Sequence, residues 1–109
     1  MKHNLDTNTN TLSIAFPGDV LSTNVDGLRQ TAFALLEPDP LKRATWKTLK
    51  LDLTAAKMVD SAGLNLIVSI IKHAKSRGAA VRATVGNPNV YRTFIFTRLD
   101  KQLDLSQAA

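Results

Sequence analysis

Alternation of apolar and polar residues predicts two half-buried β-strands, over residues 11–16 and 48–53. In the first segment Leu12, Ile14 and Phe16 would share one side. In the second, every other residue is a leucine. A period of two places these side chains on one face of a sheet, so each segment is expected to cover a core with that face.

Apolar residues at helical spacing predict three helices. The first begins after Thr23 or Asn24, either of which is a suitable N-cap, and ends before a proline-containing stretch. The second begins at the turn around Ser61 and ends near Gly78, and the third covers about 89–98. The apolar stripe expected for the second helix consists of Leu64, Ile67, Val68, Ile71 and Ala74, widened by Leu66 and Ile70.

The order of these elements predicts the fold class. Residues 80–85 are apolar and rich in strand formers, and 103–105 form a possible short closing strand. Strands that alternate with helices through short connections indicate a single α/β domain with a largely parallel sheet of four to five strands packed with helices. The chain has 109 residues, the size of one domain, with a compact core expected over about 11–105.

Charge and composition narrow the classes of function. Fourteen basic and nine acidic residues give a net charge of +5, which suggests a polyanionic partner. The cations are dispersed along the chain rather than gathered in one run, and no array of aromatic and basic residues accompanies them. Direct nucleic-acid binding is therefore disfavoured, while an acidic protein partner remains an alternative.

Several absences favour a cytoplasmic protein that is not inserted in a membrane. No stretch approaches the roughly 20 apolar residues that a membrane span needs. The first residues lack the apolar region of a secretory signal, and there is no cysteine for a disulfide framework. Oligomeric state stays open, and Trp46 and Phe96 are expected in the core.

The segment Asp60-Ser61-Ala62-Gly63-Leu64 is the most informative part of the sequence. It lies between a predicted strand and the second helix, where open α/β sheets place functional groups. One interpretation is structural: the Ser61 hydroxyl acts as the N-cap of the helix. The other is functional: the first-turn amides and the helix dipole favour a phosphate added to Ser61.

An enzymatic interpretation has little support. Neither His3 nor His73 has an evident position as a base for Ser61, and His73 is expected at the surface or at the core boundary. No metal-ligand cluster, phosphate-binding glycine loop or paired carboxylate site stands out. We therefore expect a protein without enzymatic activity, cofactor or metal.

The sequence resembles the STAS-domain proteins, the family of anti-sigma factor antagonists. The resemblance is carried by residues 51–53 followed by 58–64, with Ser61 in the central motif. Further matches are Gly18 after the first long strand, Leu28-Arg29, Gly78 and the segment 88–99, so that nearly the whole chain is covered. It departs from the family pattern at Leu21, where many members have an Asp, and in the longer connection 37–47.

The resemblance implies a bacterial partner-switching phosphoprotein in signal transduction and transcription regulation. In such antagonists, the serine at the Ser61 position is phosphorylated by a kinase that is also the anti-sigma factor, and a serine phosphatase restores it. The unmodified form binds the kinase and the phosphorylated form does not. The implied partner-binding residues are Gly18, Asp19, Thr23, Asp60, Ser61, Ala62, Gly63 and Asn65, while Asp52 is expected to be structural. A role as a STAS subunit of a transporter or phospholipid-trafficking ATPase complex is the alternative.

Overall fold

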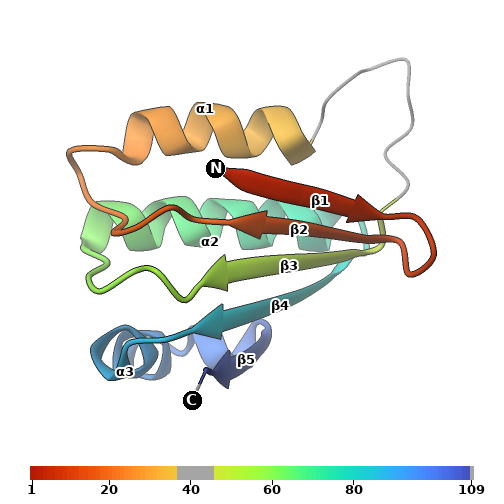
Figure 1. Cartoon of the computed structure of the whole chain (residues 1–109). Coiled ribbons are helices and arrows are strands. Elements are labelled where there is room, and N and C mark those ends of the chain that lie inside the picture. The colour runs from red at the N-terminus through yellow and green to blue at the C-terminus, as the bar shows by residue number, and fades with distance from the viewer. Residues whose placement is uncertain (37–45, 109) are drawn as a thin grey trace.

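The fold is a five-stranded mixed sheet with three α-helices, seen in a computed structural model that describes residues 1–36 and 46–108 (Figure 1). The strands and helices follow in this order: β1 (Lys2–Asp6), β2 (Thr11–Ala15), α1 (Val25–Leu36), β3 (Thr48–Leu53), α2 (Ser61–Ser76), β4 (Ala80–Val85), α3 (Pro88–Phe96), the 3-10 helix η1 (Leu99–Lys101) and β5 (Asp104–Gln107). The predicted α/β class and largely parallel sheet are confirmed.

Strand order in the sheet equals strand order in the sequence, β1-β2-β3-β4-β5. β2 to β5 are parallel to one another, and β1 pairs antiparallel with β2. The register places Leu12 beside Leu49 and Leu49 beside Val81, which aligns the apolar positions of neighbouring strands on one face. Because the order never reverses, successive parallel crossovers fall on the same side of the sheet.

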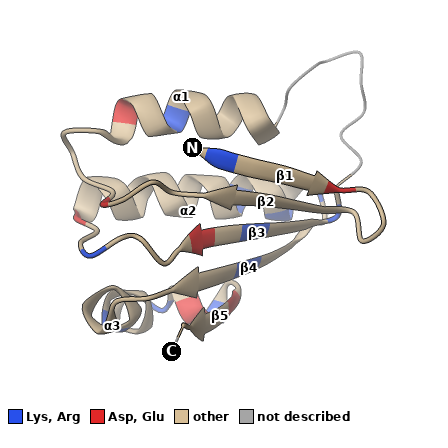
Figure 2. Cartoon of the chain, in the orientation of Figure 1, with Lys and Arg blue, Asp and Glu red and all other residues tan. Residues whose placement is uncertain are grey.

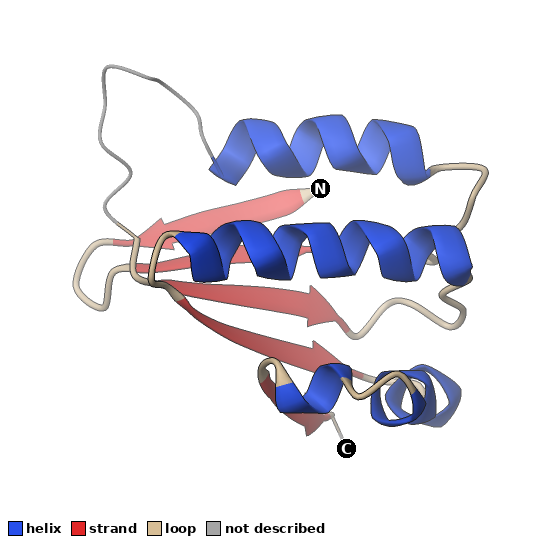
Figure 3. Ribbon diagram, turned by 180° about the vertical axis from the view of Figure 1, so that it is seen from behind, coloured by secondary structure: helices blue, strands red, loops and turns tan. Residues whose placement is uncertain are grey.

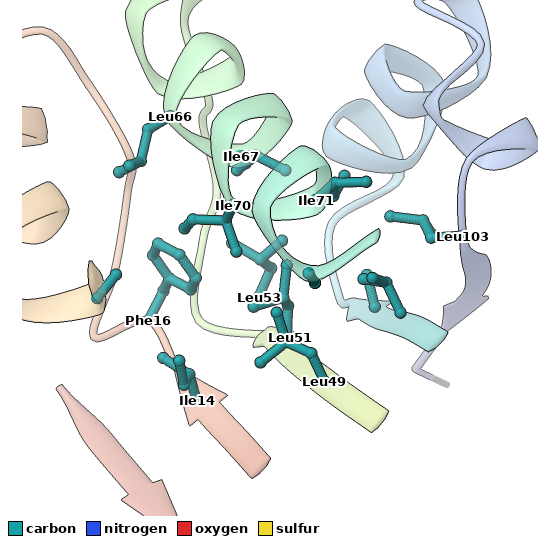
Figure 4. Close-up of a cluster of buried hydrophobic side chains, with 14 of the residues drawn as sticks. Ile14, Phe16, Leu49, Leu51, Leu53, Leu66, Ile67, Ile70, Ile71 and Leu103 are labelled. Atoms are coloured by element: carbon teal, nitrogen blue, oxygen red, sulfur yellow. The ribbon is translucent and has the colours of Figure 1, made fainter. Parts of the chain in front are cut away.

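The three helices accordingly lie on one face of the sheet, as the view from behind shows (Figure 3). Figure 4 shows the core between the sheet and α2, with Ile14, Leu49 and Leu51 of the strands directed toward Ile67 and Ile70 of α2. These five side chains are completely buried. The opposite face of the sheet carries the alternate, polar positions, such as Lys50 and Arg82 at the same register.

α2 is buried along a slightly different stripe from the one expected. Its buried residues are Gly63, Leu66, Ile67, Ile70, Ile71 and Ala74. Leu64 and Val68, which the spacing predicts within the stripe, are only partly buried and lie at its margin. The helix has more apolar surface than the sheet covers, so the spacing alone does not fix which side turns inward.

Three further expectations are corrected or limited by the structure. The sheet includes β1, which lies before the core expected over 11–105 and is exposed at every position. Trp46 is buried as expected, but Phe96 is 84% exposed and is not a core residue. Most of the long 37–47 connection, residues 37–45, lies outside the described residues.

The end of α2 is fixed by a left-handed glycine. Gly78 has φ +77°, and its N–H donates to the carbonyl of Lys75 while the next N–H, of Ala79, donates to Ala74. This is the Schellman arrangement that satisfies the last helical carbonyls. Among the helices of the described residues, none combines the length and apolar character needed to cross a membrane.

Candidate functional site

α2 begins at the end of the sheet where the parallel strands finish, the left end in Figure 1. Ser61 is the first residue of α2 and is exposed. Two loops meet beside it, one from β2 to α1 and one from β3 to α2. An isolated parallel bridge between Val20 and Val59 joins these loops, so the sheet is in effect extended by one pair of residues toward the site.

Asp60, not Ser61, caps α2. Its Oδ1 accepts a hydrogen bond from the Gly63 N–H at 2.9 Å, and its backbone is extended, as an N-cap requires. The capping role given to the Ser61 hydroxyl by the structural interpretation is therefore wrong. Because the neighbouring carboxylate fills the cap position, Ser61 becomes the first helical residue and is presented at the surface.

The second carboxylate oxygen of Asp60 fixes the other loop. Its Oδ2 accepts a hydrogen bond from the Ser22 N–H at 2.8 Å. The N–H of Gly63, then that of Ser22, stabilise the charged form and hold the pKa of Asp60 below its ordinary value. One ionised side chain thus connects the start of α2 to the start of α1.

Asp19 makes a reciprocal connection from the β2–α1 loop. Its Oδ1 accepts hydrogen bonds from the N–H groups of Lys57 and Met58, at 2.8 and 3.1 Å. Asn24 secures the backbone of the same loop, since its Nδ2 donates to the Asp19 carbonyl. The two loops are therefore joined by one carboxylate from each side.

Gly63 is where α2 approaches the β2–α1 loop most closely. A Cβ atom at this position would lie 2.8 Å from the carbonyl carbon of Val20 and even nearer to its oxygen. The Asp60 N–H donates to that same oxygen at 3.2 Å. The glycine thus permits a close contact between backbones that sets the distance from α2 to the loop.

The structure brings all eight expected site residues to this end of the molecule. Ala62 is half-buried and Gly63 buried behind the exposed Ser61, and Asn65 is exposed one turn further along α2. The β2–α1 loop supplies the others, Gly18 and Asp19, both half-buried, and Thr23, which is exposed.

Sequence reasoning missed three residues of the site. Ser22 and Val20 bind Asp60 through their backbones, which side-chain identity does not reveal. Met58 is 59% exposed three residues before Ser61. A large apolar residue in a loop of small and polar ones was the signal available for Met58.

Asp52, at the end of β3, is a structural residue rather than a neighbour of Ser61 in the hydrogen-bond network. The Thr54 hydroxyl donates to its Oδ1 at 2.6 Å and the Thr54 N–H donates at 2.9 Å. These bonds, the hydroxyl's first, lower the pKa of Asp52 from its ordinary value. The carboxylate closes the turn that begins the β3–α2 loop.

The histidines lie apart from this site. His3 is in the edge strand β1 and is exposed, and His73 is half-buried near the other end of α2, edge-on to Phe33 at 5.5 Å between ring centroids. Residues 1–36 and 46–108 contain no group of three or more His, Cys, Asp or Glu side chains able to hold a metal ion.

Comparison with known proteins gives one family and a set of similar structures. The sequence pattern of the STAS domain matches residues 2–108. A search of curated protein sequences gives no significant match.

Three solved structures illustrate the similarity of fold. An anti-sigma factor antagonist from Mycobacterium paratuberculosis is 18% identical with a TM-score of 0.75, over 96% of this chain and 84% of that one. The phosphorylated form of SpoIIAA, a Bacillus cell fate determinant, is 15% identical with a TM-score of 0.66, over 99% and 92%. A sulfate transporter family protein from Wolinella succinogenes is 12% identical with a TM-score of 0.71, over 89% and 76%.

Proposed function

Because the chain belongs to the STAS domain family, we propose that it is an anti-sigma factor antagonist that switches partners through phosphorylation of Ser61. In this proposal the unmodified protein binds a kinase-type anti-sigma factor, the kinase phosphorylates Ser61 and the complex separates, and a serine phosphatase restores binding. The observation that carries the proposal is an exposed serine at the first position of α2, beside a cap already occupied by Asp60.

The site has the electrostatics of a switch. A phosphoryl group at the N-terminus of α2 interacts favourably with the helix dipole, so the fold tolerates it. It also adds about −1.5 to −2 charges at neutral pH, next to the ionised Asp60. A partner surface shaped for a neutral hydroxyl and an exposed Met58 would have to desolvate that charge, which opposes association.

The names of similar structures support this choice within the STAS family. They include an anti-sigma factor antagonist and a protein whose phosphorylated form has been solved. Both similarities are of fold, so they support the proposal only together with the position of Ser61. The site consists of two loops and the end of a helix, which is consistent with a protein that acts by binding a partner.

Phosphorylation tests the acceptor directly. Incubation with the cognate anti-sigma kinase and ATP is expected to add one phosphate to the protein and none to Ser61→Ala, as measured by intact-mass spectrometry. Ser22→Ala removes a nearby exposed serine side chain and should still be labelled. Phosphate on the Ser61→Ala protein would refute the assignment.

Binding of two aspartate variants to the same kinase tests the second half of the switch. Ser61→Asp is expected to bind the kinase more than a hundredfold more weakly, which corresponds to a penalty of about 3 kcal/mol. Ser106→Asp, which adds the same charge on the exposed edge strand β5, should bind normally. Isothermal titration calorimetry measures both, and equal affinities for Ser61→Asp and the unmodified protein would exclude an electrostatic switch.

A transporter-associated role is the second candidate, and the similarity to a sulfate transporter family protein favours it. In that case the same helix end would contact a transporter subunit or an ATPase. Affinity purification of the tagged protein followed by mass spectrometry separates the two candidates. Recovery of a transport ATPase, unaffected by Ser61→Asp, would replace the switching proposal.

A further inference from the structure

A groove lies on the helical side of the molecule, between α2 and the corner where α3 passes into η1. It has a volume of about 330 Å³ and is lined by Val68, Ile71, Lys72, Thr97, Arg98, Leu99 and Gln102. Ile71 and Leu99 are buried, and Val68 is partly exposed above them. The groove therefore has an apolar floor with a cation on each wall, Lys72 on α2 and Arg98 on the corner.

The helices that border the groove carry cations. α2, α3 and the corner that follows α3 contain Lys72, Lys75, Arg92 and Arg98 and no acidic residue. Figure 2 shows where the charged residues fall on the ribbon. A ligand with carboxylates would therefore meet little repulsion from α2 or α3. The acidic residue of η1, Asp100, follows the groove residue Leu99 and lies 4.0 Å from the Nζ of Lys101.

The corner beside the groove has two unusual features. Arg98 has φ 60°, a left-handed conformation that is uncommon outside glycine. Just before it, Ile95 is 41% exposed and Phe96 is 84% exposed. Isolated exposed apolar residues are ordinary, but a phenylalanine this exposed, directly before the groove residues Thr97 and Arg98 in the sequence, resembles the aromatic anchors of protein interfaces.

The groove is continuous with the Ser61 site along one helix face. Ser61, Asn65, Val68 and Lys72 follow at spacings of four, three and four residues, and none of them is fully buried. Residues so spaced share a helix face. At 1.5 Å per residue the face is about 16 Å long, which is short enough to fall within one standard interface patch of about 800 Å² per partner.

We propose that this groove, defined by Val68, Lys72, Arg98 and Leu99, docks an acidic segment of the protein partner that places an apolar side chain on its floor. The inference rests on the proposed function, since it names a second contact region for the partner that binds at Ser61. A second copy of the chain is a poorer occupant, because a net charge of +5 on each copy opposes association. The rim charges would govern the association rate and its dependence on salt.

Two synthetic peptides test the groove without using the kinase. Each has about 15 residues, enough to form a short helix, with leucines at helical spacing. One carries glutamates between the leucines, and its twin carries lysines. Two-dimensional ¹H–¹⁵N spectra should show the acidic peptide shifting the amides of Val68, Lys72 and Arg98, with weaker binding in high salt, while the basic peptide leaves them unchanged.

Charge reversal supplies the matched control. The double variant Lys72→Glu/Arg98→Glu should bind the acidic peptide at least about tenfold more weakly. Lys50→Glu/Arg82→Glu makes the same change of charge on the opposite face of the sheet and should bind as the parent does. Circular dichroism establishes that each variant is folded before its binding is compared.

Three results would overturn the inference: no binding of the acidic peptide, equal binding of both peptides, or shifts centred on Lys50 and Arg82. Concentration-dependent self-association that covers the groove would identify a second copy as the occupant. If the acidic peptide does not bind but the kinase still labels Ser61, the groove proposal fails and the switch stands. If the acidic peptide binds but Ser61 is not labelled, the switch is refuted and the groove stands. The two proposals are therefore separable.

Discussion

Gly63 and Gly27 occupy the third position of α2 and α1, yet their surroundings differ. A Cβ at Gly63 would collide with the Val20 backbone, while one at Gly27 would meet nothing within 4 Å. We predict that Gly63→Ala lowers the free energy of unfolding by about 1–3 kcal/mol, since a backbone contact cannot relax as a side chain does. Urea unfolding followed by circular dichroism measures the change.

Gly27→Ala is the control for that prediction. It should be neutral or stabilising by up to about 1 kcal/mol, because alanine favours a helix over glycine. If Gly63→Ala and Gly27→Ala had the same effect, the close approach of α2 to the β2–α1 loop would not contribute to stability.

The identity of the helix cap shows why the candidate site was only partly predictable. Serine and aspartate are comparable N-caps, and Asp60 and Ser61 are adjacent, so the sequence allows either. The choice depends on Ser22, 38 positions away, whose N–H binds the carboxylate. Local preference identified the turn, but a long-range contact decided which residue is exposed on it.

At the scale of the element, the end of α2 depends on Gly78. Its φ of +77° lies in the left-handed region, where a side chain costs about 1–2 kcal/mol. Gly78→Ala should reduce the free energy of unfolding by about that amount, and Gly78→Asn by less. Gly18→Ala is the control, because this glycine has open space around it. Thermal unfolding measures both variants. Equal stability of Gly18→Ala and Gly78→Ala would contradict the role of Gly78 in ending the helix.

β1 is the strand that sequence patterns did not predict. Its five residues are all exposed, so they carry no alternation of apolar and polar positions. The strand is recognisable only through its antiparallel pairing with β2, from Lys2–Ala15 to Asp6–Thr11. β2 and β3 were predictable for the opposite reason, since each buries every other residue.

For the whole molecule, the sequential strand order explains why the two sheet faces differ. Helices cover one face, and Lys50 and Arg82 lie on the other. The sequence predicted the parallel sheet because helices alternate with strands, but it did not predict that Phe96 is exposed, since apolar character alone does not identify a partner surface. Both the Ser61 site and the α2–η1 groove lie on α2, so one helix links the proposed switch to the proposed docking surface.

The stability of the whole fold in acid depends on two hydrogen-bonded carboxylates, Asp52 and Asp60. Hydrogen bonds lower the pKa values of Asp52 and Asp60 in the folded protein, so the unfolded state takes up their protons first as the pH falls. Their stabilisation is present above the unfolded pKa of about 4 and is lost as the pH falls through the lowered folded values. Asp52→Asn/Asp60→Asn should therefore flatten the decline in the free energy of unfolding between about pH 5 and 2, measured by urea titrations. Asp26→Asn/Asp104→Asn removes two exposed carboxylates and controls for net charge. If both double variants flattened the pH dependence of the free energy of unfolding equally, the decline in stability would be due to overall charge and not to the hydrogen bonds of Asp52 and Asp60.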